Sequence, residues 1–263
     1  MSMPLKKILT WASILIYFGV FFLVYSREPL PKLEKGIVFL LPVIFLAGAS
    51  VYFYVKSRVG VFAKTSLYFL LGSFSLLVAE FLWIGFDIFL SEPPYPSLAD
   101  IFYLISYPLL FAGVLTQVRV EKLNLQSSFF GFSSIILFLL MGVTFYFGIL
   151  QAYDIEASIW LNVVFLAYGI ADVFVLVMAL LVLNTAFLEK INSRAWILFA
   201  LGMASTWIGD LLYALYYEPF NEGVYPYILI DITWVLWYFL MGFSFLYFVS
   251  DSLKKPPLPT GAT

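Results

Sequence analysis

The sequence contains neither cysteine nor histidine. Without cysteine, the protein has no disulfides, thiolate metal sites, iron–sulfur clusters or cysteine nucleophiles. Without histidine, it lacks the usual haem and zinc ligand, the usual general base and the side chain that titrates near physiological pH. Polar chemistry is therefore left to carboxylates, hydroxyls, amides and indoles, and we expect no cofactor.

Charged side chains are also scarce. They make up 11% of the 263 residues, against about a quarter in soluble proteins. The net charge of −2 gives no basis for nucleic-acid binding. Hydrophobic residues reach 63% of the chain, or about 166 residues, and eight membrane helices of about 20 residues need about 160. Nearly the whole chain can therefore lie in a lipid bilayer, which leaves no room for a soluble catalytic domain.

Apolar runs separated by short polar breaks predict an all-α integral membrane protein with eight transmembrane helices. The predicted spans are 8–25, 36–55, 62–90, 97–118, 127–150, 158–183, 195–217 and 226–249. Together they form a single membrane domain over residues 1–255, followed by a short cytoplasmic tail at 256–263.

The basic residues predict the orientation, because Lys and Arg gather in cytoplasmic loops. With a cytoplasmic N-terminus, three of the 14 basic residues fall on the outer side and the other eleven on the inner side. The three outer residues are Arg27, Lys32 and Lys35. We therefore expect both termini in the cytoplasm and the protein in the cell membrane.

An internal repeat relates the third and fourth predicted spans to the seventh and eighth. At an offset of 130 residues, or 131 after one inserted residue, the matching pairs are Gly72 and Gly202, Glu80 and Asp210, Tyr95-Pro96 and Tyr225-Pro226, Asp100 and Asp231, Tyr103 and Trp234, and Tyr107 and Tyr238. Four spans per repeat is an even number, so two halves at about 1–125 and 126–255 are predicted to be parallel repeats about an axis along the membrane normal.

Six carboxylates fall within predicted spans, at Glu80, Asp87, Asp100, Asp172, Asp210 and Asp231. Four of them are predicted to lie at one level near the outer side. Each begins an i, i+3, i+7 series on one helical face, with two aromatic rings in three of the series and with Trp83 and Asp87 in the series from Glu80. The predicted outward-facing pocket is lined by Glu80, Trp83, Asp100, Tyr103, Tyr107, Asp210, Tyr213, Asp231, Trp234 and Tyr238. With no basic residue deep in any span, these acids are expected to be protonated or to pair with a cation from outside.

Other interpretations of the same acids stay open. Asp172, on a face with Tyr168, is a possible proton site nearer the midplane. Asp87 is expected close to the outer surface, where it simply reaches water. The remaining acids can also serve as polar contacts that hold helices together. The residues indicate no catalytic group, and they leave open whether a metal ion is bound.

The segment PPYPSLADIFYLISYPLLFAG (93–113) resembles the multi-span sensory regions at the N-termini of some bacterial and archaeal diguanylate cyclases and histidine kinases. The matching residues are Pro96, Ser97, Ala99, Asp100, Tyr103, Tyr107 and Pro108, then Gly209, Asp210 and Tyr213, then Asp231 and Trp234. The resemblance covers roughly residues 60–250. It implies a sensory membrane region, and because the relatives continue into output domains whereas a short tail follows here, it implies a separate cytoplasmic partner.

Three functions are therefore weighed. The first is a receptor-like module that senses a cation, an amine or an amphiphile. The second is a small secondary transporter coupled to protons or Na⁺ through the acids. The third, a lipid-modifying enzyme, has the least support, because no His, Cys or Arg accompanies the acids to act on a phosphate.

Overall fold

The computed structural model describes residues 3–27, 32–90, 95–121, 132–150, 158–188, 193–217 and 227–252, and these ranges contain helices and no strand. The helices are α1 (Met3–Tyr25), α2 (Lys32–Ser57), α3 (Ala63–Phe89), α4 (Leu98–Glu121), α6 (Phe132–Val143), the π-helix η1 (Thr144–Leu150), α7 (Ile159–Leu188), α8 (Ser193–Leu215) and α10 (Tyr227–Ser252). The predicted tail at 256–263 and the second Tyr-Pro pair at 225–226 lie outside the described residues.

Six helices are long and apolar enough to cross a membrane: α2, α3, α4, α7, α8 and α10. The first and fifth predicted spans also coincide with helices, but their apolar described stretches are shorter, at Ser13–Tyr25 and Phe138–Phe147. The all-helical, multi-pass membrane character predicted from composition is thus supported by six spans.

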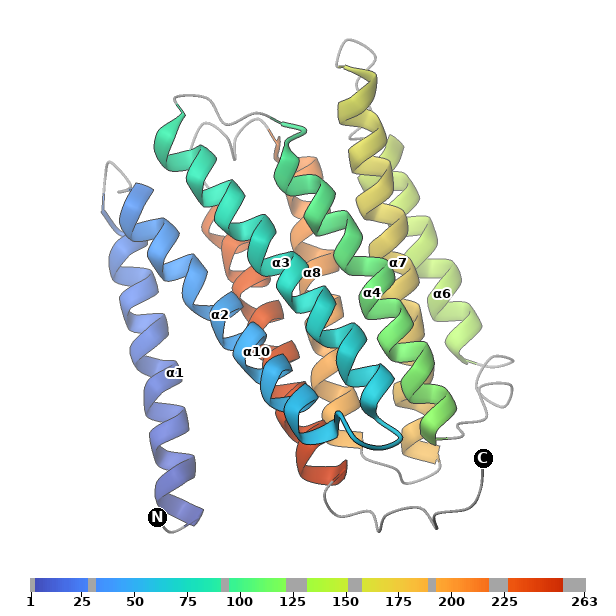
Figure 1. The fold of residues 1–263 in the computed structure, drawn as a ribbon. Coiled ribbons are helices and arrows are strands. Elements are labelled where there is room, and N and C mark those ends of the chain that lie inside the picture. The colour runs from blue at the N-terminus through green and yellow to red at the C-terminus, as the bar shows by residue number, and fades with distance from the viewer. Residues whose placement is uncertain are drawn as a thin grey trace.

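The helices form one bundle in which helices consecutive in the chain run antiparallel, whereas α2 runs parallel to α10 and α4 runs parallel to α7 (Figure 1). α3 packs against α4, and α8 packs against α10. α2 joins these pairs by packing on α3 and α10, and α7 does so by packing on α8 and α4. α1 lies outside α2, and α6 lies outside α7. The start of α1 and the end of α10 lie at the same end of the bundle (Figure 1).

The apolar core consists largely of stacked aromatic rings. Phe69 from α3 lies with its ring centroid 4.8 Å from that of Phe245 in α10. Phe53 from α2 stacks on Phe248 with centroids 5.9 Å apart. Each of these four side chains is buried. These contacts tie α2 and α3 to α10 in the half of the bundle near the α2–α3 turn, where Gly60 adopts a positive φ of 138° that suits glycine.

A proline in α2 is compensated by a neighbouring helix. Pro42 has no amide hydrogen, so the carbonyl of Val38, four residues earlier, loses its usual helical donor. The hydroxyl of Tyr17 in α1 donates to that carbonyl at 3.1 Å. The contact restores a hydrogen bond in an apolar environment, where a free carbonyl is costly, and it helps to fix α1 on α2.

The two central hairpins are held by the same kind of polar contact. In the first, the hydroxyl of Ser75 donates to the carbonyl oxygen of Phe102 at 2.6 Å. In the second, the hydroxyl of Ser205 donates to the carbonyl oxygen of Thr233 at 2.7 Å. The two serines are 130 positions apart and the two carbonyls 131, which are the offsets found in the sequence.

Candidate ligand-binding cavity

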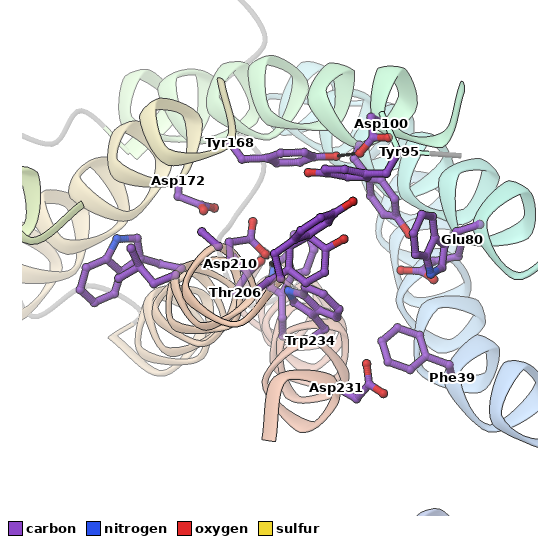
Figure 2. A pocket seen from close by; sticks show the side chains of 18 of the residues that line it. Phe39, Glu80, Tyr95, Asp100, Tyr168, Asp172, Thr206, Asp210, Asp231 and Trp234 are labelled. Atoms are coloured by element: carbon purple, nitrogen blue, oxygen red, sulfur yellow. Dashed lines mark hydrogen bonds between the residues drawn. The ribbon is translucent and has the colours of Figure 1, made fainter. Parts of the chain in front are cut away.

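A cavity of about 530 Å³ lies at the end of the bundle where α2, α4, α7 and α10 begin and α3 and α8 end (Figure 2). All ten residues predicted for the pocket line it: Glu80, Trp83, Asp100, Tyr103, Tyr107, Asp210, Tyr213, Asp231, Trp234 and Tyr238. Asp87 and Asp172 line it as well, so the structure brings all six intramembrane acids to one cavity.

Asp210 and Asp172 form one acidic centre of this cavity. The indole nitrogen of Trp234 donates to Asp210 Oδ1 at 2.7 Å. The hydroxyl of Tyr107 donates to Asp172 Oδ1 at 2.7 Å and lies 3.3 Å from Asp210 Oδ2. A phenol has one hydrogen to donate, so the shorter distance assigns it to Asp172. The Tyr107 hydroxyl thus lies between the two carboxyl groups, which makes Asp172 part of the same centre as Asp210.

Glu80 forms a second acidic centre. Its side chain is buried, and Oε1 accepts a short hydrogen bond from the hydroxyl of Tyr238. Within the part of the chain that the structure describes, Oε2 is buried and accepts no hydrogen bond of ordinary geometry. The hydroxyl of Tyr103 is a further polar neighbour of this carboxyl group. Glu80 therefore retains an acceptor position within the cavity.

The rings that meet the acids come from other helices than the sequence pattern suggests. The i, i+3, i+7 series places an acid and one or two rings on one helical face, but side chains on one face project side by side. The printed bonds run between helices instead, from Tyr238 in α10 to Glu80 in α3 and from Trp234 in α10 to Asp210 in α8. The acids and rings line one cavity, and the hydrogen bonds between them join different helices instead of members of one series.

Asp100 has a local structural role that the sequence analysis missed. Ser97 precedes α4, and its backbone N–H donates to Asp100 Oδ2 at 2.6 Å. Ser97 Oγ donates to the same oxygen at 3.0 Å, while it accepts from the N–H of Ala99 at 3.1 Å. Asp100 Oδ1 accepts from the hydroxyl of Tyr168 at 2.8 Å. This is a capping box, which the Ser-x-x-Asp spacing before an apolar run could have indicated.

Two lysines at the start of α2 reach acids of the cavity. Lys35 Nζ lies 3.4 Å from Asp231 Oδ2, which also accepts from the hydroxyl of Tyr25 at 2.5 Å. Lys32 Nζ lies 3.4 Å from Asp87 Oδ1 and donates to the backbone oxygen of Asp87 at 2.8 Å. The prediction that the chain supplies no cation to the pocket acids is therefore wrong for Asp231, and Asp87, which was expected simply to reach water, pairs with Lys32. The hydropathy pattern places the backbone of these lysines at the start of a span, but a lysine side chain is long enough to carry its ammonium group into the cavity.

A cluster of rings closes one side of the cavity near the α3–α4 turn. The ring of Tyr95 lies 5.8 Å from that of Tyr213 and 5.4 Å from that of Tyr217, and Phe165 from α7 lies 5.6 Å from Tyr217. Burial raises the pKa of Tyr95 well above its ordinary value, and neighbouring tyrosines and Asp100 add to the shift. Tyr95 thus stays neutral. Tyr95 was not among the residues predicted for the pocket, although its place in the repeated Tyr-Pro pair could have indicated it.

The arrangement suits a cation better than other chemistry. Six carboxyl groups face two ammonium groups, and the walls between them are mainly aromatic. Ring faces attract cations, the more so where water is excluded. Within the described ranges, no three acidic side chains lie close enough together to hold a metal ion. Oxygen acceptors and ring faces are therefore what the cavity offers to a ligand.

Comparison of the chain with protein-family models, curated proteins and solved structures found no match.

Proposed function

We propose that the protein is a receptor-like sensory module of the cell membrane that binds an organic cation in this cavity. The observation that carries the proposal is the collection of six buried or half-buried carboxyl groups and many rings around one space of about 530 Å³. That size falls within the range of about 300–1,000 Å³ typical of small-molecule sites. Ionisable groups at membrane depth are costly to place there, and such groups commonly mark a ligand or ion site.

The proposal includes an outward-facing cavity and a duplicated architecture. The cavity lies opposite the end where Lys56, Arg58, Lys64, Arg119 and Arg194 lie at helix termini. Basic residues favour the cytoplasmic side, so this distribution supports a cavity that opens outward and termini that lie inside. The matched serine–carbonyl bonds and the matched helix contacts support two parallel four-helix repeats.

A route from the cavity to the opposite end runs through α4 and α8. Near the cavity these helices meet where Tyr107 lies against Asp210. Towards the other end, the indole nitrogen of Trp196 in α8 donates to Glu121 Oε2 in α4 at 3.3 Å. A cation that changes the first contact would shift α4 against α8 and so alter the second. We propose that a separate cytoplasmic partner reads this change, as the resemblance to sensory regions implies.

Ligand binding can be tested on the full chain in lipid nanodiscs. We expect butylamine, phenylethylamine and tetramethylammonium to raise the temperature of thermal unfolding, because a ligand that binds the native state stabilises it. Asp210→Asn should abolish the shift. Glu34→Gln is the matched control, since Glu34 is an exposed acid near the same end, paired with Arg27 outside the cavity. A wild-type protein that no amine stabilises would refute the proposal.

Secondary transport is the second candidate, favoured by the Tyr107 hydroxyl that connects Asp172 and Asp210. Buried acids linked by a hydroxyl are suited to proton transfer between helices, and parallel repeats are found in transporters. Reconstituted vesicles distinguish the two functions. A receptor binds butylamine without moving it, whereas a transporter accumulates radiolabelled butylamine when a proton or Na⁺ gradient is applied.

A further inference from the structure

We propose that the ligand carries two ammonium groups on a linear chain, that is, a diamine, with one group at Glu80 and the other at the Asp172–Asp210 centre. This inference rests on the proposed function, because it specifies which organic cation the cavity binds. It follows from which acids of the cavity already have partners within the chain.

Three of the six acids are already neutralised or fully hydrogen-bonded. Asp87 pairs with Lys32 and Asp231 pairs with Lys35. Asp100 accepts hydrogen bonds on both oxygens, as part of the α4 capping box and from a tyrosine hydroxyl. Hydrogen bonds of this number stabilise a carboxylate without a counter-ion. These three acids therefore do not require a ligand.

The other three acids form two centres with no ammonium group bound to them in the described structure. Glu80 is 2% exposed, and its Oε2 is buried without a hydrogen bond of ordinary geometry. Asp172 is 1% exposed, and the Tyr107 hydroxyl that donates to it at 2.7 Å lies 3.3 Å from Asp210, so the two carboxyl groups form one centre. Each centre thus offers carboxyl oxygens to a cation, because a buried carboxylate without a partner is costly.

The two centres lie on different sides of the same space. Glu80 projects from α3, while Asp210 and Asp172 project from α8 and α7. Figure 2 shows Glu80 and Asp172 on opposite sides of the cavity, with Asp210 and Trp234 between them in this view. A molecule with a cation at each end and an apolar middle fits this arrangement better than a single ammonium group does. The rings between the centres suit a methylene chain.

The cavity already holds primary ammonium groups of the chain itself. Lys35 places its Nζ beside Asp231 at 3.4 Å, with the side chain half-buried at 23% exposure. Four methylene groups of this lysine lead to an ammonium held by a carboxylate and next to a tyrosine hydroxyl that binds the same oxygen. One end of an alkyl diamine has the same chemistry, which is why we choose primary amines over quaternary ones.

The test compares monoamines and diamines of equal length on the full chain in nanodiscs, by calorimetric titration. The probes are butylamine, hexylamine and octylamine against diaminobutane, diaminohexane and diaminooctane. We expect the best diamine to bind at least about tenfold more tightly than its monoamine, the effect of one additional charge-assisted hydrogen bond. Affinity should pass through a maximum with chain length, because the distance between the centres is fixed.

Variants separate this inference from the proposed function. Glu80→Gln should remove the diamine advantage and keep monoamine binding, and the retained binding shows that the variant is folded. Glu34→Gln should change neither. Equal affinity for diamines and monoamines in the wild type would overturn the diamine inference and leave an organic-cation site in place. Absence of binding by every amine would overturn the proposed function as well.

Discussion

Tyr238 donates a hydrogen bond to Glu80, which lies 158 positions earlier in the chain and on a different helix pair. The corresponding contact on the other side of the bundle joins Tyr107 in α4 to Asp210 in α8 at 3.3 Å. Each predicted half therefore supplies a tyrosine to the acid of the other half. These two contacts lie at the cavity wall, so the shape of the cavity depends on how the halves fit together.

Replacing Tyr238 by phenylalanine should destabilise the protein by about 1 kcal/mol. Interhelical hydrogen bonds in membranes contribute about 0.6 kcal/mol on average and up to about 1.7, and this change also leaves Glu80 without its donor. The free energy of unfolding in a mixed-micelle titration measures the effect. Tyr146→Phe is the control, because Tyr146 is exposed in η1. A loss of equal size in both variants would show that the Tyr238 contact contributes nothing specific.

The fold was largely predictable because hydropathy and helical periodicity are local properties. Spans of about 20 apolar residues identify helices without knowledge of their neighbours. The cost of turning a charge to lipid places acids such as Glu80 and Asp210 inside the bundle. Both arguments need only the sequence around each residue, and the ten residues that they selected line one cavity.

The pairing within the cavity depends on distant parts of the chain and was not predictable. The hydrogen bond from Tyr238 to Glu80 depends on how α10 packs against α2 and α8. No pattern in the sequence around either residue indicates that packing. Lys35 is another example, because its backbone lies at a helix start while its ammonium group reaches Asp231. The role of Asp100 differs, since its capping box is encoded by four consecutive residues and could have been recognised.

Gly209 should prove necessary for the Asp210 centre. A Cβ at this position would lie 2.8 Å from the indole nitrogen of Trp234 and still closer to the hydroxyl oxygen of Thr233. Gly209→Ala should therefore push α10 away from α8 and displace Trp234 from Asp210. Added volume in a packed interior typically costs about 1–3 kcal/mol, so we expect a lower unfolding temperature and a changed tryptophan emission spectrum. Gly142→Ala is the control, since nothing lies within 4 Å of a Cβ there. If Gly209→Ala is as stable as Gly142→Ala, the packing argument is contradicted.

The proposed orientation can be tested by single cysteines, because the chain contains none of its own. Arg27→Cys near the end of α1 should react with an impermeant maleimide added to intact cells. Val59→Cys in the α2–α3 turn should react only after the cells are opened, because that turn is proposed to face the cytoplasm. Val59 is 91% exposed, so failure to label it would reflect the membrane and not burial. The reverse labelling pattern would place the cavity on the cytoplasmic side.

Lys35 should compete with added amines for the cavity. Lys35→Met removes the chain's own ammonium group from Asp231 and keeps an unbranched side chain of similar length. Without amine, the variant should unfold at a lower temperature than the wild type, because Asp231 loses its charge partner while it stays buried. With butylamine present, the variant should gain more stability than the wild type does, since a third carboxylate centre becomes available to the amine.

Lys56→Met provides the comparison for Lys35→Met. Lys56 lies at the opposite end of α2, where its Nζ is 5.7 Å from the centre of the Tyr52 ring and outside the cavity. This variant loses the same charge from the same helix, so it should show the wild-type response to butylamine. The measurement is the unfolding temperature as a function of amine concentration, fitted for each variant. If butylamine stabilises both methionine variants equally, Lys35 does not occupy an amine position, and the ion pair with Asp231 serves only to hold α2 against α10.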